Sequence, residues 1–394
     1  MFKSNFFRLF TGTTIGALLM WLGTSCEGPA GPDGKNGQDA NATCTQCHNN
    51  NSPLTVKMAQ YSKSVHAEGS TVFEANSATC APCHSGNGFN EVVKNNTPST
   101  FTIGADPTKP TMYALNYTCS STVTSNPTPM SCGTCHQIHT NYDTTDFNFT
   151  WSAAVPMLMY GGSMTMDAQN SSNLCLKCHQ PRPTTSSKTG NDTVPNISNL
   201  SGPYAISTRL NHHGTVGAIY SGKGGLEIPG TESYTTKPTH STTACATCHM
   251  ANAVGYEVGG HTFNVAGLVD GTYTQNVNGC NKCHDGTTMA KITAFYPNTK
   301  STEIQGLLNT LGDKLNTIGI VTINADSTSN KYYSLTTKHY DGGAKTKTGS
   351  TNLMAAAVTN FSLVLQDRSL GIHNFAYTKA LLKNTVDALT AAGY

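Results

Sequence analysis

The chain has 394 residues, a formal net charge of +2, and only 12% charged side chains. This near-neutral composition lacks the basic excess of nucleic-acid-binding proteins, so no nucleic-acid partner is expected. Hydrophobic residues make up 37%, which is low for the core of so long a chain. Asn, Thr, Ser and Gly favour turns and loops. We therefore expect few long helices and an interior filled by more than aliphatic side chains.

Residues 1–25 resemble an export signal, because a basic leader containing Lys3 precedes an apolar stretch that ends at Leu22. The stretch is too short and too interrupted for a membrane span. Small residues then precede Cys26, as in a bacterial lipoprotein processing site. Lipidation of Cys26 is the expectation, with simple cleavage nearby or an uncleaved anchor as the alternatives. The mature chain is expected in the periplasm or on the cell surface, touching the membrane only through such an anchor.

Residues 26–43 carry four Gly-x-y triplets, starting at Gly28. This number is too small to hold a collagen triple helix, so the segment is expected to be a solvated tether.

One motif, Cys-x-x-Cys-His, recurs six times from residue 44 to residue 284. It is the signature of c-type haem attachment, in which two thioethers hold the porphyrin and the histidine ligates the iron. Structural zinc, a redox-active cysteine pair and disulfides are the alternatives. Zinc does not require a histidine directly after every pair, and a redox pair needs only one copy. The first cysteines are Cys44, Cys80, Cys132, Cys175, Cys245 and Cys280; the second are Cys47, Cys83, Cys135, Cys178, Cys248 and Cys283; the histidines are His48, His84, His136, His179, His249 and His284.

The motifs predict six covalently bound haem c groups, and each six-coordinate iron needs a second axial ligand. Eight histidines lie outside the motifs. His339 stands in a polar turn and is expected to be surplus. Adjacent histidines seldom both reach an iron, so one of His212 and His213 is expected to ligate. The probable distal ligands are therefore His66, His139, His212 or His213, His240, His261 and His373.

Beyond residue 290 the pattern changes. Apolar residues from Ile304 to Ile318 recur at helical spacing, and residues 353–365 and 376–389 also indicate helices. Residues 318–324 and 331–337 are expected to pair as a hairpin. The predicted fold is mainly α and irregular coil with little regular β structure. A haem-packed body would span residues 44–290, and a mostly helical cap, residues 291–394, would contribute His373 as a distal ligand.

The segment 211–265 resembles the multihaem cytochrome c superfamily of respiratory bacteria. The resemblance lies in His212-His213-Gly214, Gly224 to Gly230, His240, Cys245 to Met250 and Gly259-Gly260-His261, and also in the surroundings of His66, His139 and His373. It implies closely stacked haems, mostly bis-histidine, that form a continuous electron path. Ammonia-forming nitrite reductases of that superfamily typically use a Cys-x-x-Cys-Lys haem, and this chain has none. Hydroxylamine-oxidising relatives carry more haems.

The expected function is electron transfer to redox partner proteins or an external acceptor, without a substrate site of the chain's own. A subunit that self-associates into a conducting filament is one alternative. An oxidoreductase acting on a small nitrogen or sulfur oxyanion is another. Cys119 belongs to no motif and is expected to be a lone buried thiol, or a disulfide partner of Cys26 if that residue is free. Without haem, the chain is expected to stay unfolded.

Overall fold

The computed structural model divides the chain into two compact units, Met1–Ser52 and Pro53–Tyr394. Within the first unit, Cys44 and His48 are described, and both are exposed in helical backbone. The export signal, the tether, Cys26, Cys47, His213 and His339 lie outside the described residues. The structure describes residues 44, 48, 53–103, 113–183, 194–206, 212, 214–235, 240, 242–285, 299–324, 332–335 and 349–394.

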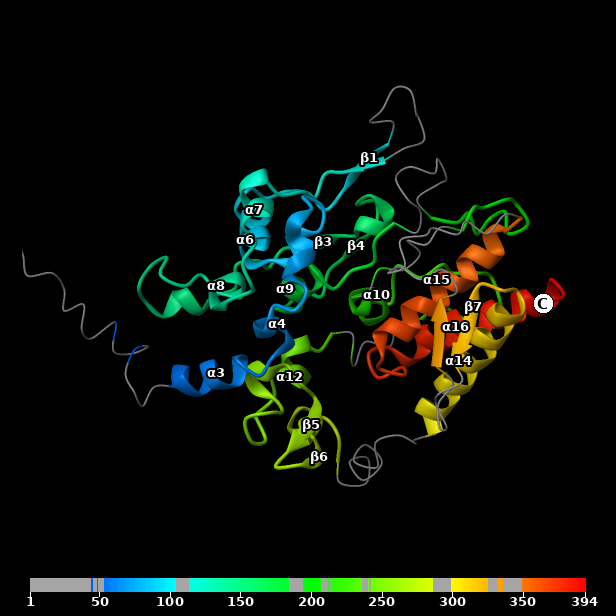
Figure 1. Cartoon of the computed structure of the whole chain (residues 1–394). Helices are drawn as coiled ribbons and strands as arrows, with labels where there is room; N and C mark the ends of the chain where they lie inside the picture. The colour runs from blue at the N-terminus through cyan, green and yellow to red at the C-terminus, as the bar shows by residue number, and fades with distance from the viewer. Residues whose placement is uncertain are drawn as a thin grey trace, which may run out of the picture. The chain divides into compact units, whose positions relative to one another are not determined.

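The second unit is mainly helical and coiled, as the sequence predicts (Figure 1). Short helices follow one another along its first part, and several of them coincide with the Cys-x-x-Cys-His motifs. They are α3 (Pro53–Tyr61), α4 (Val65–Glu68), η1 (Val72–Asn76), α5 (Ala81–His84), α6 (Gly86–Lys94), α7 (Ser121–Ser125), α8 (Cys132–Cys135), η2 (Thr144–Phe147), η3 (Leu158–Tyr160), α9 (Ser172–Leu176), α10 (Val216–Ser221), α12 (Cys245–His249), η4 (Gly260–Thr262) and η5 (Val277–Gly279).

The strands of the described residues form four antiparallel pairs of two strands each. The pairs are β1 (Phe101–Ile103) with β2 (Tyr113–Leu115), β3 (Val155–Pro156) with β4 (Thr165–Met166), β5 (Ala266–Val269) with β6 (Thr272–Gln275), and β7 (Val321–Asn324) with β8 (Tyr332–Leu335). In the last pair Val321 lies opposite Leu335. This register confirms the hairpin predicted from the sequence.

Three long helices make up the C-terminal part: α14 (Thr299–Thr317), α15 (Asn352–Asp367) and α16 (Phe375–Ala391). They lie side by side (Figure 1). Helix α15 begins where Thr351 accepts a hydrogen bond from the backbone of Met354. It is buried on nearly every face, mostly by apolar side chains, with a few buried polar ones such as Asn360 among them. The three helices confirm the periodicity read from the sequence.

The apolar core joins these helices to the segments that precede them. Leu353, Phe361 and Leu381 belong to the same buried cluster as Met166 and Ile228. The residues on either side of position 290 therefore share one core. Aliphatic side chains supply it, and their burial is worth roughly 1.5–3 kcal/mol for each large residue.

A buried amide fastens one loop to α15. The Asn360 side chain accepts a hydrogen bond from the Leu226 N–H at 2.8 Å and donates to the Leu226 carbonyl at 2.8 Å. Its second N–H donates to the Thr385 hydroxyl of α16 at 3.0 Å. Because both backbone groups of Leu226 are satisfied, the loop can be buried without an unpaired polar atom.

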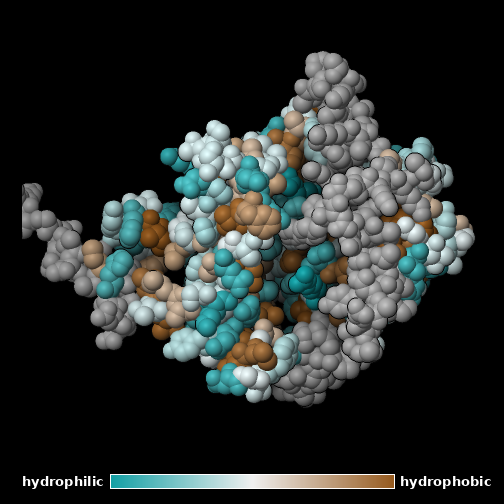
Figure 2. Space-filling model, viewed as in Figure 1, coloured by the Kyte–Doolittle hydropathy of each residue, from teal (hydrophilic) through white to brown (hydrophobic). Residues whose placement is uncertain are grey.

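Hydrophobic side chains also reach the surface in several separate places (Figure 2). One of these lies over the β5–β6 hairpin, where Leu268 is 62% exposed. Phe73 is 71% exposed. Within the described part of the chain, no helix is long and apolar enough to cross a membrane.

Candidate functional site

Each Cys-x-x-Cys-His motif of the second unit folds as about one helical turn. The histidine N–H donates to the carbonyl of the first cysteine, four residues earlier, which is the α-helical hydrogen bond. The turn thereby fixes the histidine relative to the cysteines. The N···O distances are 3.1 Å for His84, 2.9 Å for His136, 2.9 Å for His179 and 3.0 Å for His284, and His249 ends helix α12, which begins at Cys245.

Five of the motif histidines face an imidazole from elsewhere in the chain. Each pair joins one motif histidine to one of the distal histidines predicted from the sequence. The ring centres are 5.8 Å apart for His84 and His212, 6.5 Å for His136 and His261, 6.1 Å for His179 and His66, 6.2 Å for His249 and His373, and 6.1 Å for His284 and His240.

These spacings fit one metal ion held between two rings. A metal–nitrogen bond to histidine is about 2.0–2.1 Å long. Two such bonds, with the distance from each nitrogen to its ring centre, separate the centres by about 6 Å. A direct ring contact would explain the distances equally well for any single pair. It would not explain why five pairs all combine a motif histidine with an outside one.

The hydrogen bonds of the rings leave the second nitrogen for a metal. The Nδ1–H of His136 donates to the Phe147 carbonyl at 2.7 Å, and that of His249 donates to the Phe263 carbonyl at 2.9 Å. An imidazole whose Nδ1 carries the proton has its lone pair on Nε2. Such bonds to carbonyls or carboxylates are typical of metal-ligating histidines.

Two distal rings are oriented in the same way from the loop between α15 and α16. The Nδ1–H of His240 donates to the Ile372 carbonyl at 2.5 Å. The Nδ1–H of His373 donates to the Asp367 carboxylate at 2.7 Å. This loop therefore touches the outer nitrogens of two different pairs.

Local structure positions the other distal histidines. His66 lies in α4, whose N-terminus is capped by the Ser64 hydroxyl, which accepts from the Ala67 N–H at 3.1 Å. His261 lies in η4, and its N–H donates to the Gln60 side chain of α3 at 3.1 Å. His212 precedes α10.

Burial favours the neutral form of several of these rings. It lowers the pKa of His66 and of His249, although the Phe263 carbonyl opposes the change at His249. Burial, with Lys57 and His136 nearby, lowers the pKa of His261 to about 4. At His373 burial acts in the same direction, but the Asp367 carboxylate outweighs it and the pKa is raised. A neutral imidazole is the form that ligates a metal.

The ring planes fall into two classes. Three pairs are crossed, with angles of 74° for His66 and His179, 78° for His84 and His212, and 73° for His240 and His284. The other two pairs are closer to parallel, at 27° for His249 and His373 and 37° for His136 and His261.

Cysteines of different motifs meet. Cys83 and Cys178 lie close enough to influence each other's ionisation, and their interaction lowers the pKa of Cys83. Cys175 and Cys245 form a second such pair, in which the pKa of Cys245 is lowered. Cys135 lies within electrostatic reach of Cys175, and Cys248 within reach of Cys280. The second, fourth, fifth and sixth motifs are thus neighbours in that order, with the third beside the fourth.

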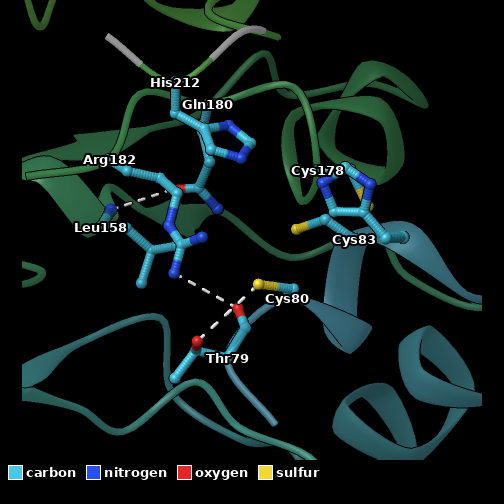
Figure 3. A pocket seen from close by; sticks show the side chains of 9 residues that line it. Thr79, Cys80, Cys83, Leu158, Cys178, Gln180, Arg182 and His212 are labelled. Atoms are coloured by element: carbon cyan, nitrogen blue, oxygen red, sulfur yellow. Dashed lines mark hydrogen bonds between the residues drawn. The ribbon is translucent and has the colours of Figure 1, made fainter. Parts of the chain in front are cut away.

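A small cavity of about 20 Å³, partly open to solvent, lies at the second motif. Cys80, Cys83 and His84 line it together with His212 and Arg182. Figure 3 shows Cys83 and Cys178 together at one end of the cavity. Arg182 donates from its guanidinium to the Thr79 carbonyl at 3.3 Å. One cation, the Arg182 guanidinium, lies on the wall of this cavity.

The fourth motif contains a buried lysine between aromatic rings. Lys177 is 1% exposed, and its Nζ lies 3.8 Å from the centre of the Trp151 ring and 5.1 Å from that of Tyr117. Burial lowers the pKa of Lys177 to about 8, against the opposing influence of Cys178 and Cys83. Attraction between the ammonium and the ring faces offsets part of the cost of burying this charge.

The other sequence-predicted residues lie apart from these pairs. His139 is exposed, has a φ of 59°, and stacks on Tyr142. Cys119 is buried, and its thiol donates to the Gly88 carbonyl at 3.3 Å. Burial raises the pKa of Cys119 to about 12, which makes the thiol unreactive. None of the described cysteines forms a disulfide.

Sequence reasoning did not identify Asp367, Arg182 or Lys177. Asp367 stands six positions before His373, which is no recognisable spacing. Among the described residues, no cluster of three or more His, Cys, Asp or Glu side chains is arranged to hold a metal ion, so the recurring unit is a pair. Comparison of the chain with protein-family models, with curated proteins and with solved structures finds no match.

Proposed function

We propose that this protein is a hexahaem c-type cytochrome that transfers electrons along a chain of covalently bound haems, in respiratory or extracellular electron transfer. Such haems supply one-electron chemistry at iron. The observation that carries the proposal is the set of five ring pairs, each combining a Cys-x-x-Cys-His histidine with a histidine from elsewhere. Redox partner proteins or an external acceptor would exchange the electrons.

The chain's own residues have three roles in this proposal. The cysteines of each motif form the thioethers, and the motif histidine is the proximal ligand. Five of the distal ligands are His66, His212, His240, His261 and His373, and His139 remains the candidate for the sixth. Arg182, on the wall of the cavity at the second motif, is the cation placed to pair with an acidic group of the bound cofactor. With two histidines per iron, such a site has no open position for a substrate.

The contacts between cysteines support a path rather than isolated centres. Cys83 interacts with Cys178, and Cys175 with Cys245, closely enough to shift their pKa values, so the second, fourth and fifth motifs are adjacent. The fourth motif has neighbours on three sides, because Cys135 of the third motif is also close to it. We therefore propose that the fourth haem is the branching point of the array.

Intact-mass spectrometry of the mature, denatured protein tests the cofactor directly. We expect the polypeptide to carry six haem masses, because thioether bonds survive unfolding. A Cys80→Ala, Cys83→Ala variant is the matched control and should lose one haem or fail to mature. Fewer than six haems on fully processed wild-type protein would contradict the proposal.

The adjacent histidines at 212 and 213 test the distal ligands. His212 faces His84, so His212→Ala should remove one strong-field ligand and turn one haem high-spin. His213→Ala, its matched control, should leave every haem low-spin, as should His339→Ala. Electron paramagnetic resonance of the oxidised variants distinguishes these outcomes. A high-spin signal in His213→Ala but not in His212→Ala would show that the pairing is wrong.

A further inference from the structure

Asp367 is a buried carboxylate directly behind one of the paired rings. It is the last residue of α15, and its side chain is fully buried, with 0% exposure. Its Oδ1 accepts the Nδ1–H of His373 at 2.7 Å. The other face of His373 looks toward His249, at 6.2 Å between ring centres. The carboxylate, the distal ring and the motif ring thus follow one another in a line of contacts.

The carboxylate is held firmly in this position. Its Oδ2 accepts hydrogen bonds from the Ser369 hydroxyl and, at 3.3 Å, from the Ser369 N–H. The same hydroxyl accepts from the His373 N–H at 3.3 Å. Arg368, in the left-handed conformation with φ 57°, turns the chain so that this loop closes on Asp367. Pinning of this kind keeps the acceptor aimed at the ring.

The other paired rings differ in the charge of their acceptors. His136, His249 and His240 donate to the neutral carbonyls of Phe147, Phe263 and Ile372. His84 has a carboxylate nearby, but Glu74 Oε2 is 3.3 Å from its Nδ1 and the Glu74 side chain is 24% exposed. Solvent weakens the field of an exposed charge, whereas a fully buried charge acts at low dielectric.

We propose that Asp367 is a positioning residue that holds the reduction potential of the His249–His373 haem below that of the same haem with a neutral acceptor at position 367. This inference rests on the proposed haem binding. A carboxylate that accepts the outer proton makes the imidazole a stronger electron donor, and its negative charge stabilises ferric iron over ferrous iron. Both effects disfavour the added electron. The fifth haem would therefore be a low-potential step in the path.

Potentiometric titration of mature protein, followed by optical and electron paramagnetic resonance spectra, tests this assignment. Asp367→Asn keeps the shape of the side chain and removes its charge. We expect the ferrous-to-ferric ratio of one haem, at a fixed applied potential, to rise about tenfold, which for one electron is about 59 mV. The affected signal should be one of the two from nearly parallel rings, because His249 and His373 are inclined by only 27°.

Two further variants separate charge from shape. Ser369→Ala keeps the carboxylate but removes its hydroxyl donor, so the charge on Asp367 is less neutralised. The ferrous-to-ferric ratio of the same haem should then fall about two- to threefold, a change opposite in sign. Asp387→Asn removes an equal charge from α16, where Asp387 is 39% exposed and paired with Lys383. It should move no haem measurably.

The outcomes are distinguishable from failure of the proposed function, because the haem number is measured by mass in every variant. Six haems with no potential shift in Asp367→Asn would overturn the inference and leave haem binding intact. An equal shift in Asp387→Asn would also overturn it, since general charge would then be the cause. If Asp367→Asn does not mature, Ser369→Ala decides: an upward or absent shift refutes the role of the carboxylate.

Discussion

Lys177 shows how single residues of a motif acquire roles that the motif does not specify. No two copies have the same pair of residues between the cysteines. In the fourth copy one of them is a lysine enclosed by Trp151 and Tyr117. Its methylene stem fills the core while its ammonium faces the rings. Burial of the charge lowers the pKa of Lys177, while the attraction between the ammonium and the ring faces offsets part of the cost of that burial.

We therefore expect Lys177→Met to leave the stability of the mature protein within about 1 kcal/mol of wild type, because Met keeps the stem and needs no solvation. Lys177→Glu should destabilise by about 3 kcal/mol or more, because it places a carboxylate against the negative faces of the rings. Guanidinium unfolding measures both. Lys94→Met, at an exposed helix end, is the control and should change little. Equal losses in Met and Glu variants would mean that the ammonium itself is required.

The proposed attachment residues could be listed from the sequence because each motif is local and repeated. Their partners could not be read with the same certainty. His212 and His213 are equivalent as sequence letters, and only the fold brings His212 to His84. The hydrogen-bond acceptors of the rings are still harder to predict. Phe147, Phe263 and Ile372 accept through their backbone carbonyls, which every residue possesses. Asp367 and Arg182 are ordinary polar residues until their neighbours are known.

Helices α14, α15 and α16 were predictable because their apolar residues recur over several turns. The predicted 353–365, for example, corresponds to α15 at Asn352–Asp367. The four-residue helices α5 and α8 have too few turns for any period to emerge. They are held by contacts with the rest of the chain rather than by helix propensity.

The short helix α10 is held by a contact of this kind, with the fourth motif. The Gly217 N–H donates to the His179 carbonyl at 2.9 Å. A Cβ at position 217 would lie 2.3 Å from that oxygen and 2.7 Å from Leu176. Only glycine allows the helix to come this close. The hydrogen bond fixes the backbone of His179, whose ring faces His66.

Gly217→Ala should therefore destabilise the mature protein by about 1–3 kcal/mol and broaden the signal of one crossed-ring haem. Gly306→Ala is the contrasting variant, because position 306 lies in α14 and a Cβ there meets nothing within 4 Å. It should stabilise by about 0.5–1 kcal/mol through the lower entropy of the unfolded chain. Thermal unfolding and resonance spectra test the pair. If the two substitutions changed the stability by similar amounts, the close approach of α10 to His179 would not be the cause.

Across the whole molecule, ring pairing is a long-range property. In four of the five pairs the partners are more than a hundred positions apart in the sequence. No local pattern can specify such contacts, which explains why the sequence predicts the ligands as a set and not as pairs. An iron held between two rings would close a long loop of chain, with the entropic advantage of a cross-link.

The structure leads us to expect that part of the haem-free protein stays folded, rather than that all of it unfolds. The cluster around α15 is built from aliphatic side chains such as Leu353, Val358 and Leu381, and needs no porphyrin to be apolar. By contrast, the smaller cluster around Ala81 and Val92 contains few large aliphatic residues. Stability without haem should therefore differ between the two ends of the second unit.

Hydrogen exchange of a variant with every motif cysteine replaced by alanine tests this difference. We expect amides of α15 and α16 to remain protected by at least about tenfold over the rates of an unfolded chain, and those of residues 53–150 to exchange at nearly those rates. Mature protein is the reference and should be protected in both regions. Uniform protection, or uniform loss of it, in the haem-free variant would refute a separately stable helical core.

The sulfur contacts between motifs constrain how the protein can be made. Cys83 lies near Cys178, and Cys175 near Cys245, although the two cysteines of each pair belong to different motifs. In an oxidising compartment neighbouring thiols combine into disulfides. A chain that folded before its cysteines had reacted would therefore join motifs to one another and block them. Under the proposed haem attachment, the order of biosynthesis follows: the cysteines must react with haem before the chain folds.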